Sequence, residues 1–439
     1  IFNQYMEKVL PTYYIHYKKI LSSLLLESNH FNIVFWYMIK KERILLVNKF
    51  YYPRGGDCMV TLNLEKLLKS KGHDVATFSM QHSQNIESQY SPYFPNEISF
   101  SGNIKNKVNA AKRIFGIDTI KTKFNQLLFD FQPDIVHLHN IHSYLSPIVA
   151  KQAKAYGCKV FWTMHDYKLL CPASACLNKN QICQQCLSDK KQVVINRCLK
   201  NSLTASLLGY IESIYWSKEK LEQWIEAFIC PSQFMADMMI KGGYSPNKIK
   251  TRCNFIEKEK IDFIKQNFSN ERSNHYCFIG RISQEKGIKT LLEIADNLPY
   301  KLIIAGNGPL LETLKKEYAS EKITFTGHLS TQEVADLLGK AKASIIPSEW
   351  YENNPLSIIE SLCMGTPVIG SRIGGIPELI TENNGILFEP FDKEELRKSI
   401  IELFENKKFD YEQISQTAIT QFSEENYYTH LCNIYRQSI

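Results

Sequence analysis

The sequence predicts an α/β protein built from two Rossmann-like, doubly wound domains. Short apolar runs that end in polar or glycine-containing loops alternate with stretches that have the spacing of amphipathic helices. This alternation is typical of a parallel sheet covered by helices. The chain has 439 residues, which is too long for a single core, and the alternation begins a second time after residue 254.

The first series of elements begins at residue 43. We expect strands at residues 44–50, 73–80, 132–140, 159–166 and 226–232. We expect helices at residues 59–72, 147–157 and 234–243, and each of these ends at a glycine, which is a common helix terminator. A turn that contains Gly55 and Gly56 joins the first strand to the first helix.

The second series follows a joint near residues 254–260. Its expected strands are residues 275–283, 300–309, 322–329, 343–348 and 367–371, and its expected helices are residues 286–298, 310–320 and 331–341. We therefore place an N-terminal domain at residues 38–254 and a C-terminal domain at residues 255–418. Residues 1–37 lack this rhythm, and we expect either that translation starts at Met38 or that they form a peripheral extension.

The composition is that of an ordinary soluble globular protein, with 44% hydrophobic and 22% charged residues. The net charge of +7 is modest for this length. It permits an anionic partner without requiring one, and we expect no nucleic-acid partner. No run reaches the roughly 18 apolar residues of a membrane span, and we recognise no signal peptide. We therefore expect a cytoplasmic protein. For residues 1–37, an amphipathic anchor is the alternative to a peripheral extension or a start at Met38.

The stretch from residue 344 to residue 378 carries the clearest functional signal. Glu352 lies in a loop ahead of a predicted helix, and Glu360 lies within its first two turns if the helix begins near Pro355. Proline suits a first helical position because its missing N–H would have no partner there. The two carboxylates offer acceptors for sugar hydroxyls, and the free N–H groups of a helix N-terminus suit a phosphate. An accidental pair is the alternative for this spacing alone.

The residues around these glutamates resemble the E-x7-E signature of retaining glycosyltransferases of family 4, which have the GT-B fold. The matching strings are P-S-x-W-Y-E-N-N-P-L-S-I-I-E and G-T-P-V-I-G-S-x-I-G-G-I-P-E, and the resemblance covers roughly residues 41–439. It implies two Rossmann-like domains that face a central cleft. It also implies that the last segment, residues 419–439, forms a helix that crosses back to the N-terminal domain.

The activity that the resemblance implies is a retaining, metal-independent, hexosyltransferase-type reaction. The donor would be a UDP- or GDP-sugar, used as a co-substrate with no further cofactor. The acceptor would be a glycan or a lipid-linked glycan in the biosynthesis of cell-surface polysaccharide or lipopolysaccharide. Such an enzyme would work in the cytoplasm or at the inner face of the membrane.

Two cations follow a predicted strand where the donor diphosphate would need them. Arg281 and Lys286 lie at the carboxyl end of residues 275–283, the edge at which ligands bind in α/β sheets. Arginine can hold phosphate oxygens bidentately, and lysine adds a point charge. The resemblance implies that Arg281 and Lys286 bind the diphosphate, Glu360 the ribose and Glu352 the transferred sugar. The other expected donor-binding residues are Gly55, Gly56, Gly308, Asn354, Leu356 and Ser357.

The predicted N-terminal domain supplies the acceptor side of the cleft. His165 and Asp166 end one predicted strand, and His139 and Asn140 end its neighbour. In the family, a histidine at the position of His165 reaches the donor sugar, so we count it among the catalytic residues with Glu352, Arg281 and Lys286. A histidine held by the backbone is the alternative for both His139 and His165.

Cysteines cluster directly after His165. Cys183 and Cys186 have the C-x2-C spacing of a zinc ligand pair. Thiolates from Cys171, Cys176 or Cys198 could complete four ligands, with Cys171 and Cys198 as the expected pair. The alternative is a group of reduced thiols in a loop on the acceptor side, and it suits the single cysteines scattered through the rest of the chain.

A basic segment lies between residues 105 and 127. Its cations are Lys105, Lys107, Lys112, Arg113, Lys121 and Lys123, with apolar residues between them at partly helical spacing. The segment predicts either a solvated helix face or a contact with anionic lipid headgroups.

Two other functions are compatible with two doubly wound domains. A nucleotide-dependent oxidoreductase would need a G-x-G-x-x-G turn after the first strand, which the sequence lacks. A non-catalytic nucleotide-sugar-binding module would keep Arg281 and Glu360 but lose Glu352 or His165. All four residues are present, which favours an enzyme.

Overall fold

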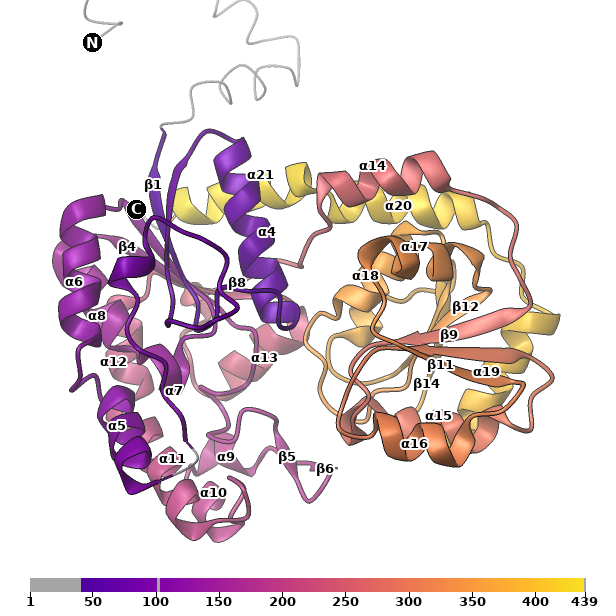
Figure 1. Cartoon of the computed structure of the whole chain (residues 1–439), viewed down its shortest axis with the longest axis horizontal. Helices are drawn as coiled ribbons and strands as arrows, with labels where there is room; N and C mark the ends of the chain where they lie inside the picture. Colours follow the sequence, from indigo (N-terminus) through magenta and orange to yellow (C-terminus); the bar gives the residue numbers. More distant parts are fainter. Residues whose placement is uncertain (1–40, 101–102, 438–439) are drawn as a thin grey trace, which may run out of the picture. The chain divides into compact units, whose positions relative to one another are not determined.

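A computed structural model describes residues 41–100 and 103–437 (Figure 1). The predicted extension at residues 1–37 lies outside the described residues. The fold belongs to the compact unit that begins at Arg43.

The first sheet is parallel and has the strand order β2-β1-β3-β4-β7-β8. Its strands are β1 (Arg43–Val47), β2 (Asp74–Phe78), β3 (Ile135–Leu138), β4 (Lys159–Thr163), β7 (Ala227–Cys230) and β8 (Ile249–Thr251). Strand β1 pairs with both neighbours, so that Leu45 lies opposite Ala76 and Val136. Nearly every residue of these three strands is buried, as their aliphatic composition requires of a sheet covered on both faces.

The core around this sheet includes side chains of the helices α4 (Gly56–Ser70), α6 (Ile120–Phe131), α8 (Ile148–Tyr156), α12 (Lys218–Trp224) and α13 (Gln233–Lys241). In Figure 1, α6, α8 and α12 lie together at one side of the sheet. The predicted basic segment forms α6 and a separate helix, α5 (Ile104–Ile114), which packs near α7 (His142–Leu145).

The chain makes a long excursion between β4 and β7 that the sequence analysis did not resolve into elements. The excursion holds a short antiparallel pair, β5 (Leu177–Asn178) and β6 (Gln181–Ile182), and the helices α9 (Gln185–Ser188), α10 (Gln192–Ile195) and α11 (Leu203–Tyr215). Its elements are too short or too weakly patterned to be read from a single sequence, except for α11.

The second sheet is also parallel and has the order β11-β10-β9-β12-β13-β14. Its strands are β9 (His275–Ile279), β10 (Lys301–Ala305), β11 (Ile323–Gly327), β12 (Ala343–Ile346), β13 (Val368–Ser371) and β14 (Gly385–Phe388). The two parallel sheets confirm the predicted α/β fold class.

Helices cover both faces of the second sheet, and each face has its own apolar core. One core includes side chains of α15 (Ile288–Ala295), α16 (Leu311–Tyr318) and α19 (Lys393–Glu405). The other includes side chains of α14 (Lys258–Asn267), α17 (Thr331–Lys340), α18 (Leu356–Cys363) and α20 (Tyr411–Phe422). The two sets of helices lie on opposite sides of the strands in Figure 1.

The last helix, α21 (Glu424–Gln437), packs against elements of the first sheet. The Tyr428 hydroxyl lies 2.8 Å from His73 Nε2, and the Tyr435 hydroxyl lies 2.7 Å from His137 Nδ1. The chain therefore returns to the first half of the fold after it has completed the second.

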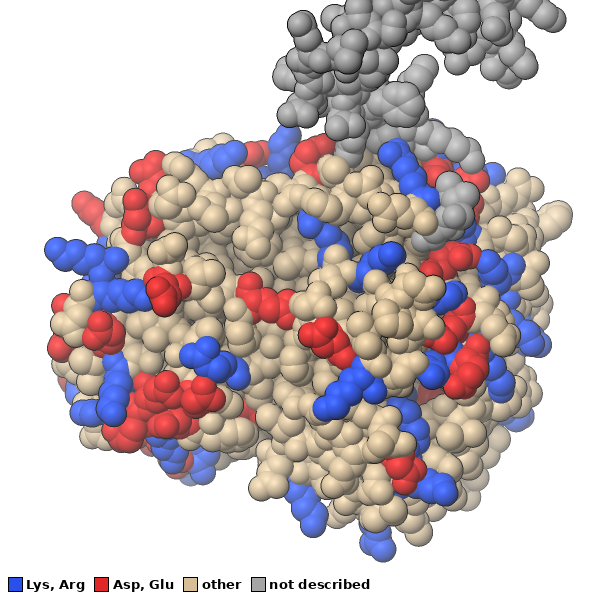
Figure 2. Space-filling model, turned by 180° about the vertical axis from the view of Figure 1, so that it is seen from behind, with Lys and Arg blue, Asp and Glu red and all other residues tan. Residues whose placement is uncertain are grey.

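Acidic and basic side chains are interspersed over much of the surface (Figure 2). Among the described helices, none combines the length and the apolar character needed to cross a membrane.

Candidate active site

A pocket of about 430 Å³ opens at the carboxyl ends of β9 and β12 and is also lined by the loop between β1 and α4. This is the edge at which open α/β sheets bind ligands. The predicted donor-binding residues that line it are Gly55, Gly56, Lys286, Glu352, Leu356, Ser357 and Glu360. Arg54, His328 and Ser348 line it as well. None of these three was among the expected site residues, although Ser348 lies within the P-S-x-W-Y-E string.

Glu352 is buried, and one of its two carboxylate oxygens accepts three hydrogen bonds. Its Oε1 accepts hydrogen bonds from Lys286 Nζ at 2.7 Å, from the Ser348 hydroxyl at 2.7 Å and from Trp350 Nε1 at 2.9 Å. Burial alone raises the pKa of a carboxyl group, but the charge of Lys286 and these three hydrogen bonds outweigh it and lower the pKa of Glu352. Glu352 is therefore an anion in the pocket, held in one orientation.

Glu360 is paired with a cation that the sequence analysis did not find. Its Oε1 accepts a hydrogen bond of 2.5 Å from Lys260, which lies on α14, one hundred residues earlier in the chain. Burial by itself lowers the pKa of a lysine, but Glu360 raises the pKa of Lys260 above its ordinary value. The pair leaves the second oxygen of Glu360 without a hydrogen-bond partner among the described residues.

The loop that carries Glu352 is held by two glycines of the G-G-I-P-E string. A Cβ atom on Gly374 would lie 2.2 Å from the Glu352 carbonyl oxygen, and a Cβ atom on Gly375 would lie 1.9 Å from that of Asn353. Gly374 also has a positive φ of 60°. Only glycine fits at either position, so the string serves to place the Glu352 backbone.

Helix α18 begins one residue later than predicted, and Pro355 is its N-cap residue rather than its first residue. Asn354 faces away from the pocket: its Oδ1 accepts from the backbone N–H of Asn254 at 2.9 Å, and its carbonyl oxygen accepts from Asn254 Nδ2 at 3.0 Å. These bonds tie the glutamate loop to the segment that joins the two sheets.

Arg281 and Gly308 do not line the pocket directly. Arg281 follows Gly280, which does line it, and its exposed guanidinium has no hydrogen-bond or ion-pair partner within residues 41–100 and 103–437. A Cβ atom on Gly308 would lie 2.1 Å from the Ile282 carbonyl oxygen. Gly308 therefore supports the backbone that carries Arg281 by allowing a close approach of two chain segments.

The expected acceptor-side residues gather at the carboxyl ends of β3 and β4. His139 Nδ1 lies 2.9 Å from His165 Nε2, and the two rings are stacked. Asn140 Nδ2 donates to Asp57 Oδ2 at 2.9 Å. Asp57 follows the two glycines of the pocket in the sequence, so this cluster adjoins the pocket through the start of α4.

Asp166 joins the group of acceptor-side residues by contacting His142. Its Oδ1 lies 3.2 Å from His142 Nε2 and accepts from the Lys168 N–H at 2.8 Å. Burial alone raises the pKa of a carboxyl group, but His142, nearby Lys49 and the Lys168 N–H hold the pKa of Asp166 well below its ordinary value. Lys49 and His142 are further members of this site that no motif revealed.

Asn353 connects this cluster to the glutamate loop. Its Nδ2 donates to the carbonyl oxygen of Met164 at 2.7 Å, and its Oδ1 accepts from the Ser232 hydroxyl at 2.8 Å. Met164 directly precedes His165. The contacts of Asn353 therefore fix the chain beside Glu352 against the chain beside His165.

Three stacked histidines extend from α21 to the site. His137 contacts Tyr435 and stacks on His139, which stacks on His165. Burial lowers the pKa of all three, and His165 contributes to lowering the pKa of His137 to about 3. His165 is therefore neutral near pH 7 and can accept or donate a hydrogen bond at a substrate.

We expect these histidines to make folding sensitive to acid. An unfolded histidine binds a proton below pH 6.5, whereas His137 in the folded protein does so only near pH 3. Stability is therefore complete above pH 6.5 and falls as the pH drops, by about 1.4 kcal/mol per pH unit for each such group. Urea unfolding between pH 7 and pH 5 should show this slope, and His137→Gln should make it shallower. An unchanged slope in that variant would contradict the pKa assigned to His137.

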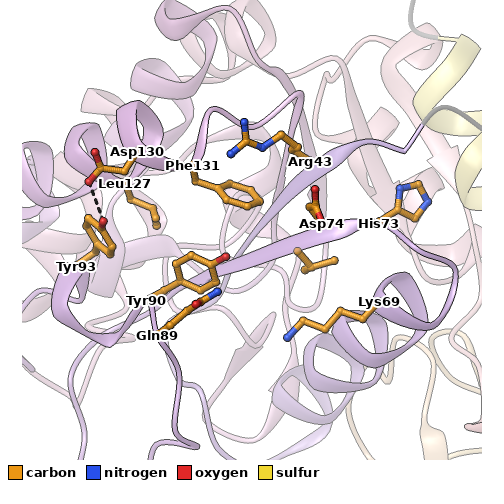
Figure 3. Close-up of a pocket in the computed structure, with 11 residues that line it drawn as sticks. Arg43, Lys69, His73, Asp74, Gln89, Tyr90, Tyr93, Leu127, Asp130 and Phe131 are labelled. Atoms are coloured by element: carbon orange, nitrogen blue, oxygen red, sulfur yellow. Dashed lines mark hydrogen bonds between the residues drawn. The ribbon is translucent and has the colours of Figure 1, made fainter.

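A second pocket, of about 570 Å³, lies at the opposite end of the first sheet (Figure 3). Arg43 and Asp74, the first residues of β1 and β2, line it together with Lys69, Tyr90 and Phe131. The side chain of Arg43 lies over the Phe131 ring, 4.9 Å from its centroid. Of these two pockets, only the first lies at the carboxyl ends of strands and contains Glu352 and Glu360, which makes it the candidate donor site.

The zinc site predicted from Cys171, Cys183, Cys186 and Cys198 is not supported. Among residues 41–100 and 103–437, no group of three or more His, Cys, Asp or Glu side chains could hold a metal ion. The Cys171 thiol instead contacts those of Cys176 and Cys186, and these contacts lower its pKa. No disulfide joins the cysteines of the described residues.

The fold and this site define a GT-B glycosyltransferase that uses a nucleotide-activated sugar. Residues 54–260 match the domain described as Glycosyltransferase Family 4, and residues 259–421 match the domain described as Glycosyl transferases group 1. The chain belongs to glycosyltransferase family 4, and it is a retaining glycosyltransferase.

Individual relatives agree with this assignment. An uncharacterized 42.6 kDa protein in the cps region of Klebsiella pneumoniae is 27% identical over 76% of this chain and 87% of its own length. One component of the human phosphatidylinositol N-acetylglucosaminyltransferase is 23% identical over 83% of this chain and 69% of its own length. The structure of Anabaena HepE in complex with UDP-glucose covers 90% of this chain and 100% of its own, with a TM-score of 0.60 and 14% identity. At that identity, the last comparison supports the fold alone.

Proposed function

We propose that this glycosyltransferase moves a hexose from a UDP-sugar to a lipid-linked glycan during assembly of a cell-surface polysaccharide. The observation that supports it most is the pairing of two anchored carboxylates, Glu352 and Glu360, with Lys286 in one pocket. The uridine base is proposed by analogy with HepE, and the polysaccharide pathway by analogy with the cps-region relative. A lipid acceptor is proposed by analogy with the phosphatidylinositol enzyme.

In the proposed donor complex, the positive charge for the diphosphate comes from Arg281 and Lys286. Arg281 has no competing partner among the described residues, whereas Lys286 must share its three donors between Glu352 and phosphate oxygens. The oxygen of Glu360 that Lys260 leaves open would accept from the ribose hydroxyls. The second oxygen of Glu352 would accept from hydroxyls of the transferred sugar.

The proposed reaction needs no protein nucleophile. The bond between the anomeric carbon and the diphosphate oxygen breaks while the acceptor hydroxyl attacks from the same face. The departing phosphate oxygen takes the hydroxyl proton, so charge and atoms balance. Arg281 and Lys286 stabilise the negative charge that grows on the leaving group. Neutral His165 would hold a sugar hydroxyl in place.

A donor screen tests this proposal. Thermal unfolding of the full chain is measured with UDP-, GDP- and dTDP-sugars, and the best donor is then followed for product formation with a lipid-linked acceptor. We expect stabilisation by a UDP-sugar and transfer to the lipid. Stabilisation without any transfer would favour a non-catalytic nucleotide-sugar-binding module, and stabilisation by a GDP-sugar alone would refute the uridine assignment.

The basic helix α5 is proposed to bring the enzyme to an anionic membrane. Lys105, Lys107 and Lys112 are exposed, as this role requires. Arg113 is a correction to the predicted set, because it is only 2% exposed and binds Asp118 and the carbonyl oxygens of Tyr144 and Asn96. It supports the fold and cannot reach a membrane.

Neutralising Lys105, Lys107 and Lys112 with glutamine should weaken binding to anionic vesicles by about 3 kcal/mol in total, or roughly a hundredfold, at low salt. Vesicle sedimentation measures this directly. A matched variant that replaces the exposed Lys301, Lys315 and Lys316 of the second half should bind as the wild type does. Equal losses of vesicle binding in both variants would show that only net charge matters. Wild-type protein that does not bind such vesicles would favour a soluble acceptor.

A further inference from the structure

Helix α11 reverses the usual polarity of a surface helix: its inward face is small and polar, and its outward face is apolar. Its buried residues are Ser206, Gly209 and Glu212, which are small or polar. Most of its exposed residues are large and apolar: Leu203, Leu207, Ile211 and Ile214 are exposed by 52%, 45%, 45% and 52%, and Thr204 is exposed beside them. A helix that packs on a protein core normally shows the reverse arrangement.

The inward face has structural reasons for its composition. A Cβ atom on Gly209 would lie 2.4 Å from Leu199 Cδ1, so the glycine allows close packing against the segment after α10. The Ser206 hydroxyl accepts from the Leu199 N–H at 3.1 Å. Glu212 binds Lys168 at 3.0 Å and the Ser143 hydroxyl at 2.8 Å. Since Glu212 is the only charged residue of α11, no charge remains on its outer face.

The apolar face continues beyond α11. Tyr215, at the end of the helix, is 43% exposed, and its ring lies 5.1 Å from that of Phe115, which follows α5. The Trp216 indole N–H donates to the Ile114 carbonyl oxygen at 2.8 Å, so the ends of α11 and α5 are joined. On α10, which packs on α11, Ile195 is 67% exposed. Figure 1 shows α5, α10 and α11 close together.

The charge around this face is positive. Arg197 and Lys200, between α10 and α11, are exposed, as are the three lysines of α5. Figure 2 shows a broad uncharged area near the bottom of the view, with both basic and acidic side chains at its margin. An apolar face with a basic border is the composition of surfaces that enter the headgroup region of anionic bilayers.

We propose that α11 inserts its Leu203, Leu207, Ile211 and Ile214 face into the outer layer of an anionic lipid bilayer. Helix α5 supplies long-range attraction, and α11 supplies apolar contact that salt does not screen. This inference rests on the proposed lipid-linked acceptor, because docking by this face would bring the N-terminal half of the site to the lipid surface.

The test compares flotation of the full chain with phosphatidylcholine vesicles that contain roughly one third phosphatidylglycerol, at about 0.1 M and about 1 M salt. We expect Ile211→Glu and Leu207→Glu each to weaken binding by about tenfold or more, and to do so at both salt concentrations. The matched control is Phe129→Glu on α6, where the native side chain is 70% exposed. This control should bind vesicles as the wild type does.

Two outcomes would overturn the proposal. The first is wild-type binding to vesicles that Ile211→Glu and Leu207→Glu leave unchanged. The second is a wild-type dimer that Ile211→Glu converts to a monomer without any loss of vesicle binding, which would show that a second copy of the chain covers α11. Stabilisation by UDP, measured in the same variants, should equal that of the wild type. A wild-type protein that UDP does not stabilise would refute the proposed donor site and leave the docking result to be judged separately.

Discussion

Replacing Glu352 with glutamine is expected to lower the turnover number by about a hundredfold to a thousandfold, with the affinity for UDP within about threefold of the wild-type value. Glutamine keeps the shape of the side chain and can still accept from Ser348 and Trp350, but it loses the charge that a sugar hydroxyl would meet. Loss of the ion pair also leaves Lys286 free to bind the diphosphate, so the affinity for UDP should be retained. Steady-state kinetics and calorimetric titration with UDP separate the two effects.

Glu349→Gln provides the matched control. Glu349 lies in the same loop, is 9% exposed and binds the Thr290 hydroxyl, but it does not line the pocket. It should therefore lose stability without a comparable loss of turnover. If Glu352→Gln instead weakened UDP binding as strongly as it slowed transfer, Glu352 would belong to the nucleotide site and the roles of the two glutamates would have to be exchanged.

The second large effect is expected at Arg281. Removing its guanidinium with Arg281→Ala should raise the dissociation constant for UDP by about tenfold to a hundredfold, because a hydrogen bond to a charged group contributes about 1.5–3 kcal/mol. The affinity for uridine should stay the same, since the nucleoside carries no phosphate. Competition against a labelled donor measures both ligands.

Arg372→Ala is a suitable control for that experiment. Arg372 is an exposed arginine of the same half of the molecule, and its partner is Glu389, outside the pocket. It should leave the affinity for UDP unchanged. Equal loss of UDP and uridine binding in Arg281→Ala would mean that the arginine acts on the base or on the fold rather than on the phosphates.

The site residues that could be predicted are those that lie close together in one continuous stretch of the sequence. Glu352, Leu356, Ser357 and Glu360 share a loop and a helix start, so the resemblance of this one stretch to family 4 was enough to group them, and all four line the pocket. Gly374 and Gly375 were recognised as part of the G-G-I-P-E motif. Their function of holding the Glu352 loop depends on a backbone contact that no local pattern encodes.

The parts that were missed depend on tertiary contacts. Lys260 meets Glu360 across one hundred positions, and Asn353 reaches Met164 across almost twice that distance in sequence. The zinc site is not supported, because the C-x2-C spacing fixes only that two thiols are near each other along the chain. It does not fix whether further ligands surround them in metal-binding geometry, and none do among the described residues. Helix α11 was overlooked because an apolar helix reads as a core helix until its exposed face is known.

The most direct test of the donor site is a crystal structure of the full chain with UDP. We predict that the nucleotide lies in the pocket between Gly55, Gly56 and α18, with the diphosphate in contact with Arg281 and Lys286 and the ribose hydroxyls on Glu360. A nucleotide in the pocket lined by Arg43 and Lys69, or a diphosphate that contacts neither Arg281 nor Lys286, would contradict it.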